Sequence, residues 1–164
     1  MTPTIPAGRM QLTEMAPRQY GAMYRFSSSV ELDHQLRLLI EIRASQINGC
    51  AFCLDMHWKD AVAAGETDER LYMLSAWRES PLYSEQERAA LELCEVVTLI
   101  AGNGVPDDVW ERAAAAFSED ELGQVVFAIA VINAWNRLQI TTRVEPGHYT
   151  PGMFDTPATA GDAR

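Results

Sequence analysis

Apolar residues recur at helical spacing along most of the chain, and no stretch shows the alternation that is typical of a β-strand. The clearest example lies between Val30 and Ile47, where the apolar positions are Leu32, Leu36, Leu39, Ile40 and Ile47. Two later stretches, 84–101 and 119–141, have the same period. The pattern therefore predicts an all-α fold, a single-domain helical bundle.

Turn and cap residues place the ends of the central helices. The serines at 27–29 are expected to cap the helix that ends near Ile47. Asn48-Gly49 then breaks the pattern, with Gly49 expected to end one helix and Asn48 to cap the next. That second helix is expected to run over about 50–64 and to stop at Gly65.

The other helices begin at recognisable caps. Thr67 is expected to cap one of them, and Ser-x-x-Glu capping boxes at 84–87 and 118–121 open the two long later helices. Shorter helices are expected over 13–24 and 106–117.

The length of 164 residues is enough for one domain with its own core. We expect a single domain over 1–164, with its core over about 13–143 and a C-terminal tail over 144–164. The tail is rich in Gly, Pro and Thr, so it is expected to lie on the surface or to pack on a neighbouring subunit.

Composition narrows the class of protein. No apolar run approaches the roughly 20 residues of a membrane helix, and residues 1–9 have no signal-peptide core. Three cysteines indicate a reducing compartment rather than a disulfide scaffold, which predicts a cytoplasmic protein. The net charge of −10 disfavours a nucleic-acid surface. Neither a membrane nor a nucleic acid is therefore expected as a partner.

The chemistry is expected at Cys50, Cys53 and His57. On a helix, positions i, i+3 and i+7 share one face, so the three side chains form a stripe with Cys53 in the middle. Two thiols with an adjacent base can carry out thiol–disulfide or peroxide chemistry. The helix dipole favours a thiolate at Cys50, but His57 lies one turn from Cys53 and can take its proton directly. We therefore expect Cys53 to react with peroxide and Cys50 to resolve the product.

Simpler interpretations exist for the same residues. Two cysteines of an amphipathic helix can be small buried hydrophobic residues. A zinc site is disfavoured because three ligands on one helix face do not enclose a metal, and a thioredoxin-like motif would follow a strand. No metal and no cofactor are therefore expected. Cys94 lies on an apolar helix face and is expected in the core, whereas His34 and His148 are isolated.

The run Asn-Gly-Cys-x-x-Cys-x-x-x-His at 48–57 resembles the core motif of the carboxymuconolactone decarboxylase-like superfamily, and most closely its alkylhydroperoxidase AhpD branch. The resemblance continues through 64–66, 71–79 and 134–137. It implies an all-α fold, usually assembled as a trimer or hexamer, and a peroxidase that forms a sulfenic acid and then an intramolecular disulfide. It also implies an external dithiol or lipoyl-bearing protein as the reductant.

The sequence departs from the family at one position of the proton relay. Related AhpD enzymes often have a glutamate twelve residues before the first cysteine, where this chain has Leu38. Glu41 lies one turn further on, rotated by roughly 60° on a 3.6-residue helix, and His34 lies one turn earlier. Either is a candidate substitute, although a solvated or interface charge is the simpler interpretation of Glu41.

Two other functions are compatible with the resemblance. One is the decarboxylation of a γ-lactone acid, which does not need two thiols. The other is a non-catalytic assembly or redox-sensing protein, which the missing glutamate at Leu38 favours. A sensor would form the Cys50–Cys53 disulfide reversibly without turning over substrate.

Overall fold

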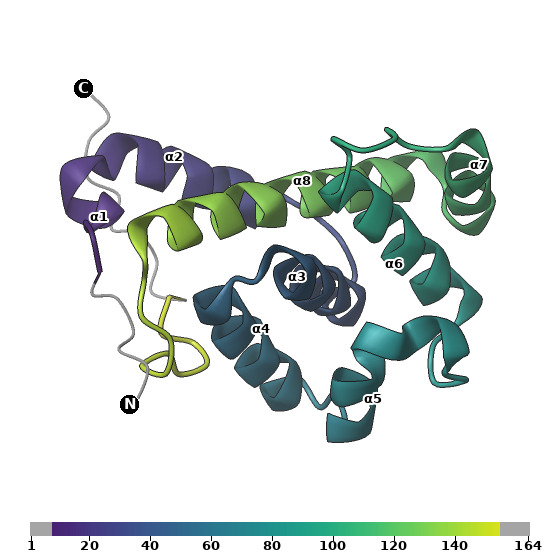
Figure 1. Ribbon diagram of the computed structural model, residues 1–164, viewed down its shortest axis with the longest axis horizontal. Helices are drawn as coiled ribbons and strands as arrows, with labels where there is room; N and C mark the ends of the chain where they lie inside the picture. Colours follow the sequence, from purple (N-terminus) through teal and green to yellow (C-terminus); the bar gives the residue numbers. More distant parts are fainter. Residues whose placement is uncertain (1–7, 155–164) are drawn as a thin grey trace.

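Helix α3, His34–Asn48, lies at the centre of the molecule and is seen nearly end-on in Figure 1. It packs against α4, Ala51–Ala63, α6, Glu85–Thr98, and α8, Glu119–Thr142. Leu39, Ile40 and Ile42 of α3 are almost fully buried. Because α3 is covered on several sides, its apolar residues extend beyond a single stripe.

The computed structural model describes residues 8–154. These residues form α-helices and one 3₁₀ helix, and the described part contains no strand, which confirms the predicted all-α class. The remaining helices are α1, Leu12–Met15, α2, Pro17–Ser28, α5, Asp68–Met73, the 3₁₀ helix Leu74–Glu79, and α7, Asp107–Ala116. None of the helices over 8–154 is long and apolar enough to cross a membrane.

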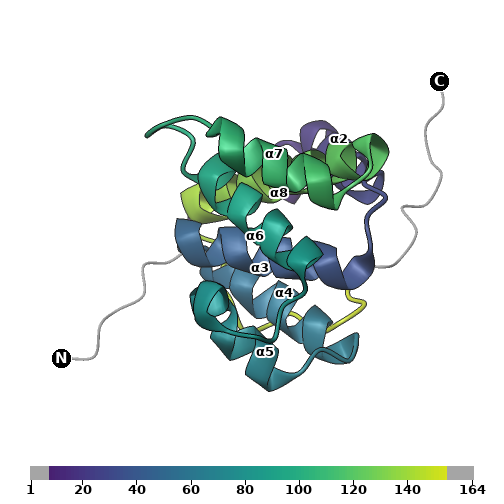
Figure 2. The same cartoon turned by 90° about the vertical axis from the view of Figure 1, so that its right-hand side faces the viewer.

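The core is divided between the two sides of α3. One cluster joins α3 to α6, α7 and α8, and it includes Ile40, Leu93 and Ile129. The other joins α3 to the segment between α4 and α6, and it includes Leu39 and Trp77. Figure 2 shows the resulting arrangement, with α2, α7 and α8 on one side of α3 and with α4 and α5 on the other.

Local cap signals account for most helix boundaries. Gly49 has φ of +72°, the left-handed conformation that ends α3, as predicted. The Thr67 hydroxyl accepts the first-turn N–H of α5. Both predicted capping boxes are complete, with the caps Ser84 and Ser118 opening α6 and α8.

Two cap predictions were wrong. Ser27 and Ser28 belong to the last turn of α2, and α3 is capped by Asp33, whose carboxylate accepts the Leu36 N–H at 2.9 Å. Asn48 does not cap α4. It is the last residue of α3, and Cys50 is the N-cap of α4.

The chain after α8 folds back over α4 of the same molecule, as the yellow segment in Figure 1 shows. The Gly147 N–H donates to the Asp55 carboxylate at 2.9 Å, and the Lys59 ammonium donates to the Tyr149 carbonyl at 3.0 Å. The Tyr149 hydroxyl bonds Asp60 at 2.7 Å. Residues 144–154 therefore form a wall beside α4, and the rest of the expected tail, 155–164, lies outside the described residues.

Candidate functional site

Cys50 and Cys53 form a disulfide at the N-terminus of α4, with their Cα atoms 5.4 Å apart. Cys50 is the N-cap residue, and its sulfur accepts the Cys53 N–H at 3.4 Å. Each cysteine has only 1% of its surface exposed. The predicted pair is therefore placed to form a disulfide, with an N–H donor directed at the Cys50 sulfur.

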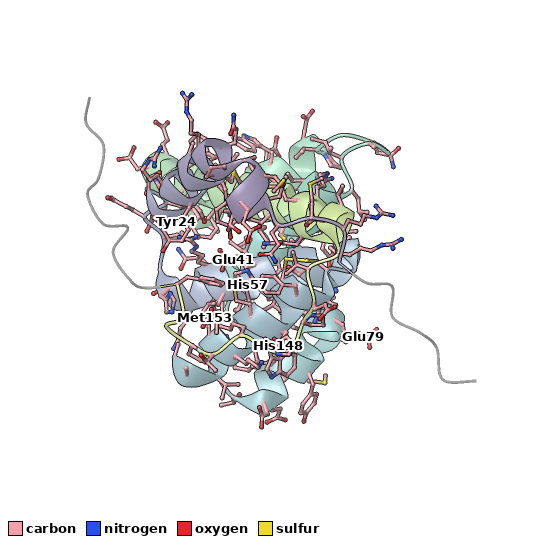
Figure 3. All side chains as sticks on the ribbon, turned by 90° about the vertical axis from the view of Figure 1, so that its left-hand side faces the viewer. Tyr24, Glu41, His57, Glu79, His148 and Met153 are labelled. Atoms are coloured by element: carbon pink, nitrogen blue, oxygen red, sulfur yellow. A yellow bond between two sulfur atoms is a disulfide. The ribbon has the colours of Figure 1, made fainter. Side chains whose placement is uncertain are left out.

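Glu41 of α3 and His57 of α4 are bonded to each other next to this pair. Oε2 of Glu41 lies 3.0 Å from Nδ1 of His57, and Figure 3 shows the two side chains adjacent inside the molecule. Oε1 of the same carboxylate accepts the Arg37 Nε–H at 2.9 Å. Glu41 is buried, so of the two simpler interpretations, a solvated or an interface charge, the solvated one was wrong.

The electrostatics of Glu41 follow from these contacts. Burial raises the pKa of the Glu41 carboxyl, but attraction to His57 and Arg37 and the hydrogen bonds they donate outweigh it, and the pKa falls to about 2. Glu41 is therefore a carboxylate at neutral pH. A carboxylate on Nδ1 fixes the orientation of the imidazole and leaves Nε2 to exchange a proton.

A cavity of about 260 Å³ lies beside the Glu41–His57 pair and the disulfide. Cys53, His57 and Glu41 all line it, together with Leu38, the position where related AhpD enzymes often have a glutamate. Cys53 and His57 are one turn apart on α4, as expected for side chains on one helix face. The cavity therefore contains a sulfur, a base and a buried carboxylate.

Aromatic side chains surround the cavity. They come from α2, α4, α8 and the segment after α8, and they are Tyr20, Tyr24, Phe52, Trp135, Tyr149 and Phe154. Tyr20 packs edge-to-face on Trp135, with ring centroids 5.2 Å apart. The Tyr24 hydroxyl donates to the Phe154 carbonyl at 2.7 Å, which ties the N-terminal helix to the C-terminal segment.

The other histidines and the third cysteine differ in whether they reach the cavity. His34 is exposed and lies at the edge of the cavity, whereas exposed His148 does not line it. Cys94 is fully buried in the core, as predicted, and burial raises the pKa of its thiol to about 12. Cys94 is therefore a poor nucleophile at neutral pH.

Arg37 is a site residue that the sequence reasoning missed. Its guanidinium bonds Glu41 and also the Ser27 hydroxyl of α2 at 3.1 Å. The i, i+4 spacing of Arg37 and Glu41 on a predicted helix was the signal that could have revealed it.

A buried polar network beneath the site was also missed. The Asn48 amide donates to Asn133 Oδ1 at 3.0 Å and to Asn136 Oδ1 at 2.8 Å, which joins the end of α3 to α8. The Asn136 amide donates to the Ser45 hydroxyl at 3.0 Å, and this hydroxyl donates to the Glu41 carbonyl at 2.7 Å. The network therefore links the α3–α4 junction, where the cysteine pair begins α4, to the turn of α3 that carries Glu41.

No three histidine, cysteine, aspartate or glutamate side chains gather as metal ligands within residues 8–154. The candidate site instead combines the Glu41–His57 pair with two cysteine sulfurs that are bonded to each other.

The family model of the carboxymuconolactone decarboxylase (CMD) family matches residues 17–95, which include α2 to α4 and the cysteine pair. A crystal structure from Agrobacterium tumefaciens has 39% sequence identity and a TM-score of 0.83, and the match covers 87% of this chain and 100% of that one. It is a protein of unknown function, assigned provisionally to antioxidant defence as an AhpD protein. This chain belongs to the carboxymuconolactone decarboxylase family, in its AhpD-like branch.

Two further relatives extend the comparison. The uncharacterized protein YdfG of Bacillus subtilis is 42% identical over 135 residues, which cover 80% of this chain and 92% of YdfG. The second is the crystal structure of an uncharacterized peroxidase-related protein of Ralstonia eutropha, described as an alkylhydroperoxidase AhpD core. It has a TM-score of 0.72 and 15% sequence identity, and the match covers 83% of this chain and 74% of the Ralstonia chain. At that identity the likeness shows only the AhpD-like fold.

Proposed function

We propose that this AhpD-like protein is a thiol-dependent peroxidase in which Cys53 attacks the peroxide, Cys50 resolves the product and His57 is the base. The observation that carries the proposal is the 3.0 Å bond between Glu41 and His57, formed in the same cavity as Cys53. A carboxylate on Nδ1 holds the imidazole in one orientation. A histidine that must take and return a proton benefits from such a carboxylate.

The reaction begins with proton transfer. His57 accepts the Cys53 proton, and the resulting thiolate attacks one oxygen of the peroxide O–O bond. The bond breaks, Cys53 becomes a sulfenic acid, and the other oxygen leaves as an alcohol or water after protonation. The Cys50 sulfur then attacks the Cys53 sulfur and displaces water, and the disulfide of the structure is formed.

Cys53 is the better candidate for the attacking thiol. It lines the cavity with His57, whereas Cys50 does not line that cavity. The N–H of Cys53 favours a thiolate at Cys50, but this donor cannot remove a proton. A base in reach can, and general base catalysis contributes more to rate than an exposed helix dipole, which is worth about 0.3–1 kcal/mol.

The reductant and the assembly complete the proposal. An external dithiol, free or carried by a lipoyl-bearing protein, returns the disulfide to two thiols. The protein acts in the cytoplasm as a homo-oligomer, a trimer or a hexamer. The exposed aromatic pair of Phe26 and Phe127, with ring centroids 5.7 Å apart, supports a subunit contact.

The decisive experiment counts free thiols in the reduced protein before and after one equivalent of an organic hydroperoxide. We expect Cys50 and Cys53 to be lost as peroxide is consumed, and buried Cys94 to remain as a thiol. If both motif thiols stay reduced and the peroxide concentration does not fall, the protein is not a peroxidase of this type.

A further inference from the structure

The two sulfurs of the pair lie against different hollows. Cys53 lines the cavity that contains His57 and Glu41. Cys50 instead lines a second hollow of about 310 Å³, between the N-terminus of α4, the end of α8 and the chain that follows it. Phe52 and Gln139 line both hollows and therefore lie between them.

In thiol–disulfide exchange, the hollow that each sulfur lines affects which sulfur an incoming thiol can attack. An incoming thiolate attacks one sulfur in line with the S–S bond, so it approaches from the side opposite the sulfur that leaves. Each cysteine is 1% exposed and lines a different hollow, so we expect attack on Cys53 to come through the cavity that contains His57 and attack on Cys50 to come through the second hollow.

The surroundings favour attack on Cys50. When Cys50 is attacked, Cys53 leaves as a thiolate on the side where His57 can return a proton to it. The thiol that reacts with peroxide is then regenerated next to its base. Attack on Cys53 would instead leave the reductant covalently bonded within the aromatic cavity.

The second hollow is suited to an incoming thiol. Its edge is formed by Gly49, where an added Cβ would meet nothing within 4 Å, and by exposed Ala51. Ile140 and Pro146 give it an apolar wall. Its charged side chains are those of Arg143 and Glu145, and the arginine offers an incoming thiolate a positive partner.

We propose that the reductant is an external dithiol that enters this second hollow and attacks Cys50, so that peroxide and reductant use opposite sides of one disulfide. This inference rests on the proposed function for the identity of the peroxide side. In the first step the reductant's thiolate bonds to the Cys50 sulfur, the Cys50–Cys53 bond breaks, and its electron pair goes to Cys53. The reductant's second thiol then bonds to its own first sulfur and releases Cys50. The dithiol is thus oxidised to a disulfide while the protein gains two electrons and two protons.

The first experiment identifies the attacked sulfur in the wild-type protein. The disulfide form is prepared with diamide, which makes the experiment independent of peroxidase activity. It is incubated briefly with glutathione and quenched with excess N-ethylmaleimide, and the peptide that carries both cysteines is sequenced by tandem mass spectrometry. We expect glutathione on Cys50 and the maleimide on Cys53. The reverse pattern would overturn the inference even in a protein that reduces peroxide.

The second experiment blocks each side separately. In Ala51→Trp, the new side chain fills the hollow at Cys50, and we expect reduction of the diamide-formed disulfide by dithiothreitol to slow about tenfold through loss of access. Oxidation of the reduced variant by peroxide should keep its wild-type rate. Met56→Trp, which fills the other cavity, is the matched variant and should slow oxidation while leaving reduction unchanged.

Either variant can contradict the inference. If Met56→Trp slows the reduction and Ala51→Trp does not, the reductant enters on the Cys53 side. Far-UV circular dichroism of both variants checks that the helical fold is retained. Failure of the wild-type protein to consume peroxide would reject the proposed function without changing the glutathione result.

Discussion

Oε2 of Glu41 and Nδ1 of His57 are 3.0 Å apart, and this bond joins α3 to α4 inside the molecule. A carboxylate is thus present beside the histidine although Leu38 occupies the position where related enzymes have the relay glutamate. Both Leu38 and Glu41 line the cavity, so a displacement of one helical turn keeps the carboxylate on the same side of α3.

We expect Glu41→Gln to move the alkylation profile of the Cys53 thiol to higher pH, because His57 loses the carboxylate that holds its Nδ1 and orients the imidazole. The measurement is the rate of iodoacetamide alkylation against pH. It is made in a Cys50→Ser background, where the other thiol, Cys94, is buried and unreactive. Glu31→Gln, at an exposed position outside the cavity, is the matched control. A profile for Glu41→Gln that overlays the control would remove Glu41 from the relay.

His57→Ala should have the larger effect on the same assay. Without the imidazole, Cys53 loses the base that lies one turn away on α4 in the same cavity, so we expect alkylation near neutral pH to slow by about 10-fold to 100-fold. His148→Ala, an exposed histidine outside the cavity, should keep the wild-type rate. Equal rates for the two variants would overturn the thiol–base interpretation.

Acid stability gives an independent test of the buried carboxylate. The pKa of Glu41 is about 2 in the folded protein against its usual 4.5. As the pH falls, the Glu41 carboxylate is therefore protonated in the unfolded chain before it is protonated in the folded protein. The stability that the ionised Glu41 contributes is complete above about pH 4.5 and is lost as the pH falls towards 2. Such a lowered pKa corresponds to roughly 3 kcal/mol of unfolding free energy.

Between pH 5 and pH 3, we therefore expect the unfolding free energy of the wild-type protein to fall more steeply than that of Glu41→Gln. Urea denaturation followed by circular dichroism at a series of pH values measures both curves. Parallel curves would mean that Glu41 titrates normally and is not held by His57 and Arg37.

Single cysteine variants separate the roles of the two thiols. Cys53→Ser should consume no peroxide, because no thiol then shares the cavity with His57. Cys50→Ser should react once and retain a sulfenic acid that dimedone labels, since the resolving thiol is missing. Lactone decarboxylation, if the protein had that activity, should survive in Cys50→Ser. Dimedone labelling at residue 50 of Cys53→Ser would reverse the assignment.

Much of the fold could be predicted because its signals are local. The capping boxes at Ser84 and Ser118 and the left-handed Gly49 depend only on neighbouring residues, and the structure has each of them as predicted. The position of the cysteine pair at the start of α4 was predicted in the same way, from the helix break at Gly49 directly before it.

The errors and omissions depend on distant contacts. Asn48 has the right chemistry for an N-cap, but its amide is used by Asn133 and Asn136 on α8. The sequence could propose Glu41 as a relay residue, yet its burial depends on how α3 packs on α4, which periodicity does not specify. The wall formed by Tyr149 likewise depends on Asp60 and Lys59, which no local rule pairs with it.

The buried asparagine network supplies the last prediction. Asn136 is fully buried, accepts from Asn48 and donates to Ser45, so Asn136→Ala removes two buried hydrogen bonds, while Asn48 keeps its bond to Asn133 and Ser45 keeps its bond to the Glu41 carbonyl. We expect a loss of about 2–4 kcal/mol in the free energy of unfolding, from the two lost hydrogen bonds and the cavity left by the shorter side chain. Asn103→Ala, at an exposed turn, is the matched control and should change stability by no more than about 0.5 kcal/mol.

The same variant tests whether the network positions the site. Ser45 is bonded both to Asn136 and to the backbone carbonyl of Glu41, so loosening this contact moves the helix that carries the relay carboxylate. We therefore expect Asn136→Ala to shift the Cys53 alkylation profile towards that of Glu41→Gln, under conditions where the variant remains folded. Loss of stability with an unchanged alkylation profile would show that the network supports the fold at the α3–α4 junction without tuning the thiol.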